Sequence, residues 1–287
     1  MYWITVNYNS TSLIEKLINS IPLQANGLDR VIIINNSPDD RSIHQLQSES
    51  ILVLDSPENI GFGRACNLGL NWVYQQDKNA IVWLINPDAT LPQNAGIVDK
   101  FFEAYPDISI LGTVVEEPCG KIEFGAGEFN LKTGLIRVKN TLPDISSSEF
   151  SYIPMIWVSG CSLLINFKNF TDCPQFDSDY FLYYEDFDLC LRYSKQGHKI
   201  GLTPDIRVQH QPSSITSRNQ ELKIQQSIYS YLLSLEKHTN RFILCYRFLR
   251  ILSVSCLSGF SSPDIAKAKL QGVWLYFSRI ISSAAAS

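Results

Sequence analysis

The chain has 287 residues, of which 45% are hydrophobic, and its formal net charge is -4 at pH 7. This length and composition argue against a disordered protein and suit one large domain with an appendage, or two modest domains. The acidic balance argues against a general nucleic-acid binder, which would carry a basic surplus. The seven cysteines form no Cys-x-x-Cys pair, and we expect reduced core thiols in a cytoplasmic protein. No basic region or long apolar segment precedes the strand pattern that begins at Tyr2, so we expect no secretory signal.

Strand and helix patterns alternate over residues 1–90. Continuous apolar runs predict strands at residues 2–6, 31–34, 51–54 and 81–85. A capping box at residues 12–15 predicts the start of one helix, and residues 63–76 have the period of another. Apolar strands separated by helices indicate an α/β fold with a parallel sheet covered on both faces.

Polar loops follow all four strands, where such a sheet collects its ligands. The loops are Asn7-Tyr8-Asn9-Ser10, Asn35-Asn36-Ser37, Asn59-Ile60-Gly61 and Asn86-Pro87-Asp88. Each loop alone is equally typical of an ordinary turn. Together they predict one ligand-binding rim.

The pattern is looser between residues 92 and 210. We expect a helix at residues 92–105, a strand at 108–115, and a hairpin followed by a mobile loop at 119–150. A buried strand is predicted at residues 157–165, interrupted by Gly160 where another group comes close to the backbone. A further strand-like segment, residues 206–209, precedes His210.

Residues 176–192, here called the acidic-aromatic stretch, combine five acids with six aromatic residues and lead into a helix that ends at Gly197. Acids are favoured at a helix start, and Asp188 is spaced to pair with Arg192. Asp186, beside Tyr183 and Tyr184, is less well explained by structure alone. A carboxylate there could accept a proton from a substrate hydroxyl, and aromatic rings pack against carbohydrate.

The composition changes from about Gln220. Residues 241–260 are apolar but interrupted by Arg247 and Arg250, which makes a poor membrane-spanning helix. Residues 237–279 contain seven Lys or Arg against one Asp. Two interpretations stay open: an amphipathic tail resting on an anionic membrane, or helices packed on the domain or on a partner.

Two residues are candidate metal ligands. Asp88 lies at the sheet rim with its approach fixed by Pro87, and a divalent cation that bridges two phosphates needs only one or two protein carboxylates. The imidazole of His210 could complete that site or contact a phosphate, although a lone histidine is more often structural. The segment Gly61-Phe62-Gly63 resembles a dinucleotide fingerprint, but Cys66 replaces its last glycine, which argues against an NAD enzyme.

In this order the motifs resemble those of family 2 glycosyltransferases, particularly the rhamnosyltransferase-like branch, over about residues 2–215. The resemblance implies a GT-A fold, with a mixed sheet flanked by helices, and an inverting transfer aided by Mg²⁺ or Mn²⁺. It implies a nucleotide-binding part at about residues 1–90, an acceptor-binding part at 91–218, and a helical C-terminal extension at 219–287.

The resemblance also implies roles for individual residues. Asp186 matches the catalytic base, and Asp88 and His210 match metal-contacting residues. The donor-binding positions are Val6, Asn7, Tyr8, Asn35, Asn36, Gly61, Arg64, Asn67, Asn86 and Asp88. The acceptor-binding positions are Gly160, Cys161, Tyr184 and Glu185. Two positions depart from the family pattern: Asn35 replaces a frequent Asp, and Pro212-Ser213 replaces a glycine-containing turn.

The function implied is transfer of a sugar, with rhamnose first, from a dTDP- or UDP-sugar to a hydroxyl of a glycan or lipid-linked saccharide in cell-surface polysaccharide synthesis. We expect no nucleic-acid partner, a cytoplasmic location, and leave open peripheral membrane contact through the C-terminal helices. One alternative is a non-catalytic nucleotide-sugar-binding or scaffolding protein of the same fold. Another is a nucleotidyltransferase, which would show a basic glycine-rich loop where this chain has Asn7-Tyr8-Asn9-Ser10.

Overall fold

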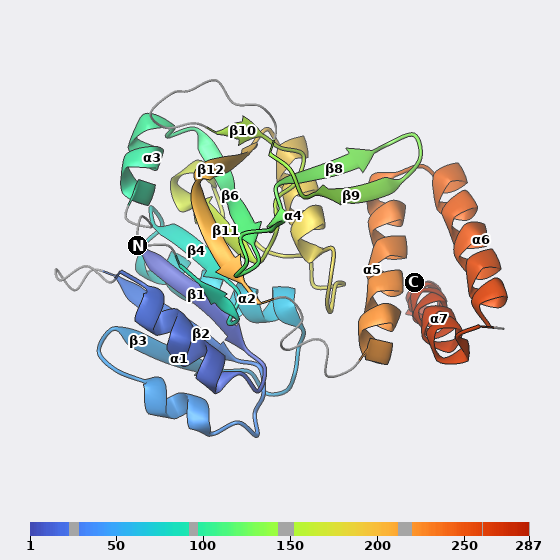
Figure 1. Ribbon diagram of the computed structural model, residues 1–287, viewed down its shortest axis with the longest axis horizontal. Coiled ribbons are helices and arrows are strands. Elements are labelled where there is room, and N and C mark those ends of the chain that lie inside the picture. Colours follow the sequence, from blue (N-terminus) through green and yellow to red (C-terminus); the bar gives the residue numbers. More distant parts are fainter. Residues whose placement is uncertain (23–28, 92–96, 143–151, 212–219, 260, 287) are drawn as a thin grey trace.

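The computed structural model describes residues 1–22, 29–91, 97–142, 152–211, 220–259 and 261–286. A mixed sheet with helices on both faces forms the larger part, and three C-terminal helices stand beside it (Figure 1). From edge to edge the sheet contains β10 (Ile153–Pro154), β12 (Lys199–His210), β6 (Ile108–Glu116), β11 (Ser162–Asn166), β4 (Ile81–Ile85), β1 (Tyr2–Asn7), β2 (Arg30–Asn35) and β3 (Ile51–Asp55). The short strands β5 (Ala89–Thr90) and β7 (Ile122–Phe124) pair with β12 and β6.

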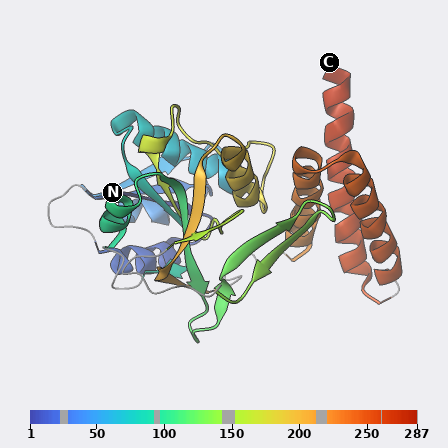
Figure 2. The same cartoon turned by 90° about the horizontal axis from the view of Figure 1, so that it is seen from above.

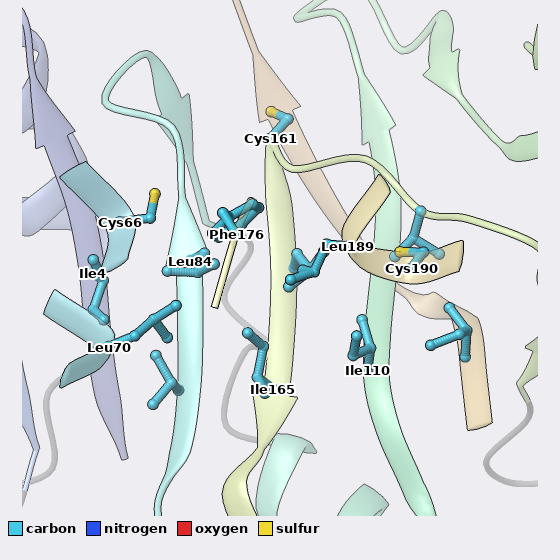
Figure 3. Close-up of a cluster of buried hydrophobic side chains, with 14 of the residues drawn as sticks. Ile4, Cys66, Leu70, Leu84, Ile110, Cys161, Ile165, Phe176, Leu189 and Cys190 are labelled. Atoms are coloured by element: carbon cyan, nitrogen blue, oxygen red, sulfur yellow. The ribbon is translucent and has the colours of Figure 1, made fainter. Parts of the chain in front are cut away.

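The four strands predicted within residues 1–90 are confirmed as β1 to β4, and their pairs are parallel. Alternate residues enter two cores, with Ile4 and Ile32 on one face and Trp3 and Ile33 on the other. The covering helices are α2 (Phe62–Gln76) on the first face and α1 (Thr11–Ser20) on the second. In Figure 3, Leu70 of α2 lies beside Ile4. Because both faces are buried, these strands show no polar alternation.

The remaining strands extend the same sheet. β11 is antiparallel to β4 and to β6, whereas β12 runs parallel to β6. Helices α3 (Val98–Ala104) and α4 (Glu185–Lys195) cover opposite faces of this half. The mixed sheet implied by the sequence resemblance is therefore confirmed, and it is continuous across residue 90.

A two-stranded hairpin, β8 (Ala126–Asn130) and β9 (Leu135–Lys139), leaves the sheet and reaches the C-terminal helices (Figure 2). At its turn the Gly134 carbonyl accepts a hydrogen bond from the Tyr231 hydroxyl at 2.8 Å, and the Thr133 carbonyl accepts one from Arg247 Nε at 2.6 Å. The predicted hairpin is confirmed. Residues 143–151 of the predicted mobile loop lie outside the described residues.

The C-terminal helices are α5 (Gln220–His238), α6 (Arg241–Ser258) and α7 (Pro263–Ala286). They pack around Leu232, Val273 and Tyr276, and α5 stands nearest the sheet (Figure 1). Within the residues described, no helix combines the length and apolar composition needed to cross a membrane.

Two sequence predictions about element boundaries are wrong. The strand expected at residues 157–165 begins only at Ser162, because the Gly160 N–H donates to a side chain instead of a neighbouring strand. The capping box at residues 12–15 is also wrong: α1 begins at Thr11, and the Ser10 hydroxyl donates to Asn7 Oδ1 rather than capping the helix.

Two further predictions are confirmed in part. The helix expected at residues 92–105 is present at Val98–Ala104, whereas residues 92–96 lie outside the described residues. All seven cysteines are free thiols, but the expectation that they are core residues fails for several. Cys66, Cys161 and Cys190 are buried, Cys173 is half-buried, and Cys119, Cys245 and Cys256 are exposed.

The buried carboxylate of Asp188 joins α4 to α5. Its Oδ1 lies 2.8 Å from His238 Nε2, and its Oδ2 accepts a hydrogen bond from Arg192 Nε at 2.6 Å. Burial alone would raise the pKa of Asp188, but the His238 hydrogen bond and the Arg192 charge lower it below its ordinary value. The predicted Asp188–Arg192 pair is confirmed, and His238 is an additional partner.

We expect Asp188→Asn to lower the free energy of unfolding by about 3–5 kcal/mol, because Arg192 loses its charged partner in a largely buried site. Denaturant titration would measure the change. Asp107→Asn is the matched control, since its pair with Lys199 is more than half exposed and should contribute far less. Equal stability of the two variants would contradict the structural role of Asp188.

Candidate functional site

Asp88 and His210 meet at one end of the sheet. Asp88 follows β4, and His210 is the last residue of β12. Pairing of β5 with β12 sets Ala89 opposite His210, and the Gln211 N–H donates to the Asp88 carbonyl at 3.1 Å. As a result, His210 Nε2 lies 3.1 Å from Asp88 Oδ1. The structure thus brings together the two residues that the sequence singled out as metal ligands.

Glu123 of β7 contacts the other side of the same imidazole, with its Oε2 2.7 Å from His210 Nδ1. Burial would lower the pKa of His210, but hydrogen bonds with Asp88, Cys161 and Glu123 outweigh it and raise the pKa to about 12. Sequence reasoning missed Glu123, because no motif or periodicity distinguishes it from other acids of the hairpin region.

A divalent cation would fit these groups by displacing the proton that His210 Nε2 shares with Asp88, since a metal-ligating imidazole is neutral. A metal-bound histidine usually donates its other ring N–H to a carboxylate, as Glu123 is placed to accept, while Asp88 offers an oxygen beside Nε2. In the described part of the chain, no group of three or more His, Cys, Asp or Glu residues could hold a metal. A cation here would therefore depend on phosphate and water oxygens for its remaining ligands.

Two backbone N–H groups hold the Asp186 carboxylate at the start of α4. Gly160 N–H donates to Oδ2 and Phe187 N–H donates to Oδ1, both at 2.8 Å. A Cβ added to Gly160 would lie 3.2 Å from the Asp186 Cβ, which confirms the close approach predicted at this glycine. Burial raises the pKa of Asp186, and the two N–H groups oppose that rise only in part.

Cys161 connects Asp186 to the Asp88–His210 pair. The Cys161 carbonyl accepts a hydrogen bond from the Asn86 N–H at 2.9 Å, and its thiol is hydrogen-bonded to His210. Its chain neighbour Gly160 holds Asp186. The predicted acceptor residues Gly160 and Cys161 therefore lie between the candidate base and the candidate metal ligands.

A cleft of about 310 Å³ opens beside these groups. Glu123, Cys161 and Asp186 line it together with the aromatic residues Tyr183 and Tyr184. Both tyrosines have left-handed backbone conformations, with φ of 69° and 64°. Such conformations cost on the order of 1–3 kcal/mol each and are concentrated at functional sites. An aromatic cleft with a carboxylate suits a carbohydrate ligand.

The other acids of the acidic-aromatic stretch do not line this cleft. Glu185 is buried toward α2: the Cβ of Glu185 lies 3.6 Å from the position that a Cβ on Gly63 would occupy. Burial and then the Asp186 charge raise the pKa of Glu185, and its Oε2 has no hydrogen-bond partner among the described residues. Asp177 and Asp179 both contact Lys237 Nζ of α5, at 2.5 and 2.9 Å.

The predicted donor residues at the ends of β1 and β2 converge, but several are used in holding loops. Asn7 Nδ2 donates to Asn35 Oδ1 at 3.0 Å, and Asn36 Nδ2 donates to Asn59 Oδ1 at 2.9 Å. All three of Asn7, Asn35 and Asn36 are buried. Among their neighbours, Val6 is a core residue and Tyr8 is exposed at the rim.

The predicted donor residues of α2 contact the acidic-aromatic stretch. Asn67 Nδ2 donates to the Phe176 carbonyl at 2.9 Å, and the Phe176 N–H donates back to Asn67 Oδ1 at 2.8 Å. Arg64 Nε donates to the Ser178 carbonyl at 2.7 Å. Gly61 has φ of 85°, and a Cβ there would lie 2.4 Å from the Phe181 carbonyl oxygen, so only glycine fits. These residues hold the stretch against α2.

The family model described as glycosyl transferase family 2 matches residues 2–153. N-acetylglucosaminyl-diphospho-decaprenol L-rhamnosyltransferase of Mycobacterium tuberculosis is 24% identical over 237 residues, which cover 75% of this chain and 77% of that protein. Rhamnosyltransferase WbbL of Escherichia coli is 25% identical over 222 residues, which cover 73% of this chain and 83% of WbbL.

Solved structures show the same fold. GalNAc-T7 with UDP, GalNAc and Mn²⁺ has a TM-score of 0.58 at 13% identity; the match covers 82% of this chain and 47% of GalNAc-T7, about half of its length. S. aureus TarS 1-349 with UDP-GlcNAc has a TM-score of 0.54 at 14% identity, and the match covers 95% of this chain and 81% of TarS 1-349. The GT-A fold implied by the sequence resemblance is confirmed.

Proposed function

Since this chain belongs to glycosyl transferase family 2, we propose that it moves a sugar, with rhamnose the first candidate, from a nucleoside diphosphate to a hydroxyl of a glycan or lipid-linked saccharide. Cell-surface polysaccharide synthesis is the corresponding process. The two relatives named rhamnosyltransferases support the sugar. A dTDP-sugar is the first candidate donor and a UDP-sugar the second.

The observation that carries this proposal is the carboxylate of Asp186 in an aromatic cleft that also reaches Cys161 and Glu123. Asp186 takes the proton from the acceptor hydroxyl as its oxygen bonds to the anomeric carbon, and the bond from that carbon to the diphosphate breaks. The attacking oxygen and the leaving diphosphate occupy opposite faces of the sugar, so the configuration inverts. The raised pKa of Asp186 makes the carboxylate a stronger base.

Asp88 and His210 are the residues proposed to hold Mg²⁺ or Mn²⁺. Bound there, the cation would stabilise negative charge on the departing diphosphate by several kcal/mol. Glu123 orients the imidazole by accepting from Nδ1. Retention of Asp88 and Asp186 disfavours the alternative of a non-catalytic binding protein.

The other predicted site residues divide by position. The rim formed by Val6, Asn7, Tyr8, Asn35 and Asn36 is proposed to receive the nucleoside, with Asn86 beside the phosphates. Residues 1–90 would then bind the donor, 91–218 the acceptor, and 219–287 form the helical extension. The donor site is proposed to be supported by Gly61, Arg64 and Asn67, which hold the acidic-aromatic stretch against α2. The acceptor side is proposed to be supported by the buried Glu185 of the same stretch.

Helices α6 and α7 are proposed to rest on the cytoplasmic face of a membrane. Phe242 is 89% exposed, Leu257 72% and Trp274 67%. The described residues of these two helices carry six Lys or Arg and one acid, a balance that suits an anionic bilayer. Sedimentation with phosphatidylserine vesicles should show binding that falls in a variant with all three apolar residues changed to Ala. Undiminished binding of that variant would contradict the contact.

We expect Asp186→Asn to lower the transfer rate by about 10²–10⁴-fold, because no base then accepts the hydroxyl proton. Thermal stabilisation by the nucleotide-sugar should persist. In the wild type, the transfer rate should fall as the pH is lowered. The fall should begin above the pH at which an ordinary Asp is protonated, because the pKa of Asp186 is raised. Asp172→Asn, at an exposed position, is the control. Full transfer by Asp186→Asn would exclude Asp186 as the base.

We expect Glu123→Gln to weaken Mn²⁺ affinity about 10–100-fold in the presence of UDP, because the imidazole loses its orienting carboxylate. Electron paramagnetic resonance of free Mn²⁺ measures this without turnover. Glu117→Gln removes an acid of the same type that pairs with Lys121 at the surface, and it should leave Mn²⁺ affinity unchanged. Wild-type affinity in Glu123→Gln would remove Glu123 from the proposed site.

A further inference from the structure

A second pocket, of about 350 Å³, directly adjoins the cleft that holds Asp186. Three residues, Ile136, Tyr184 and Ser227, line both cavities. The second pocket lies among the hairpin strand β9 and the three C-terminal helices, which contribute the rest of its wall. A molecule could therefore extend from one cavity into the other without leaving the protein surface.

The second pocket is cationic. Arg247, Arg250 and Lys269 line it, and no Asp or Glu does. Among the described residues, none of these three forms an ion pair with a carboxylate, unlike Lys237 and Arg279 nearby. Arg247 is buried, and its Nε donates to the Thr133 carbonyl, which fixes the guanidinium at the pocket wall. Cations gathered without acids favour an anionic ligand with several oxygens.

The same pocket is also aliphatic. Leu135, Ile136, Ile228, Ile251 and Val254 line it beside the cations. A nucleotide contains phosphate groups but no hydrocarbon chain. A glycan without a lipid contains neither. The ligand that matches both parts carries a diphosphate joined to a hydrocarbon chain.

We propose that this pocket binds the diphosphate and the first part of the lipid chain of a lipid-linked acceptor. The inference rests on the proposed function, since the saccharide attached to that diphosphate would lie in the adjoining cleft at Asp186. The lipid chain leaves along α6 past Val254, which is exposed, toward Leu257. The C-terminal extension thereby forms part of the acceptor site.

The test measures binding of farnesyl diphosphate, which carries both features and no sugar, with UDP present in excess to fill the donor site. Arg250→Ala and Lys269→Ala should each weaken its affinity about ten-fold, because each removes a charged hydrogen-bond donor. Lys267→Ala is the matched control: the residue lies on the same helix, pairs with Glu221 and lines neither cavity. UDP affinity, measured separately, reports the donor site in every variant.

Farnesol or inorganic diphosphate binding as tightly as farnesyl diphosphate would overturn the proposal, because one half of the ligand would then suffice. Unchanged farnesyl diphosphate affinity in both variants would also overturn it. A third result would also overturn it: both variants lose affinity for farnesyl diphosphate only when phosphatidylserine vesicles are present. Arg250 and Lys269 would then act at the membrane surface and not in the pocket. Intact UDP binding and donor turnover alongside any of these results would leave the proposed function standing. Absence of donor turnover, with farnesyl diphosphate binding as expected, would instead overturn the proposed function and leave the second pocket as a lipid-diphosphate site without an assigned reaction.

Discussion

The position of Asp186, the proposed base, depends on how two helices, α2 and α5, hold the acidic-aromatic stretch. Asn67 and Arg64 of α2 hold its beginning through backbone groups of Phe176 and Ser178. From the other side, His238 of α5 holds Asp188 in a buried pair. Two successive left-handed residues, Tyr183 and Tyr184, lie between these anchors. A strained segment of that kind persists only where its surroundings fix it, and here the surroundings come from both ends of the chain.

This arrangement makes the C-terminal helices part of the framework that supports the candidate site. Ser230 donates to the Leu182 carbonyl and Lys237 contacts Asp177 and Asp179, so α5 follows the stretch over much of its length. The hairpin β8–β9 closes the other side by docking its turn on Tyr231 and Arg247. Helices packed on the domain, one of the two interpretations that the sequence left open, are thereby confirmed for α5. The exposed apolar residues of α6 and α7 are compatible with a membrane as a second neighbour.

The sequence predicted what depends on local pattern and missed what depends on distant partners. Strands β1 to β4 were predictable because both faces of the sheet are buried, which gives continuous apolar runs. Asp88 and Asp186 were predictable as candidates because each follows a recognisable boundary of an element. Glu123 and His238 were not, since their importance comes only from the imidazole and the carboxylate that the fold sets against them. For the asparagines of the rim, contact with the donor stays a prediction. The structure adds a second role that the sequence did not indicate, since Asn7 donates to Asn35 and Asn36 donates to Asn59.

Because the two cavities adjoin, the proposed acceptor site limits which step of glycan assembly such an enzyme would catalyse. Tyr184 and Ser227 line both, so an acceptor whose diphosphate lies against Arg250 and Lys269 has little length to span before it reaches Asp186. The hydroxyl presented to the base would then belong to a sugar close to the diphosphate. A long glycan would present its far end well beyond the cleft. If the diphosphate is bound as proposed, the reaction belongs early in assembly, after a step that joins a first sugar phosphate to the lipid phosphate and before the chain is extended.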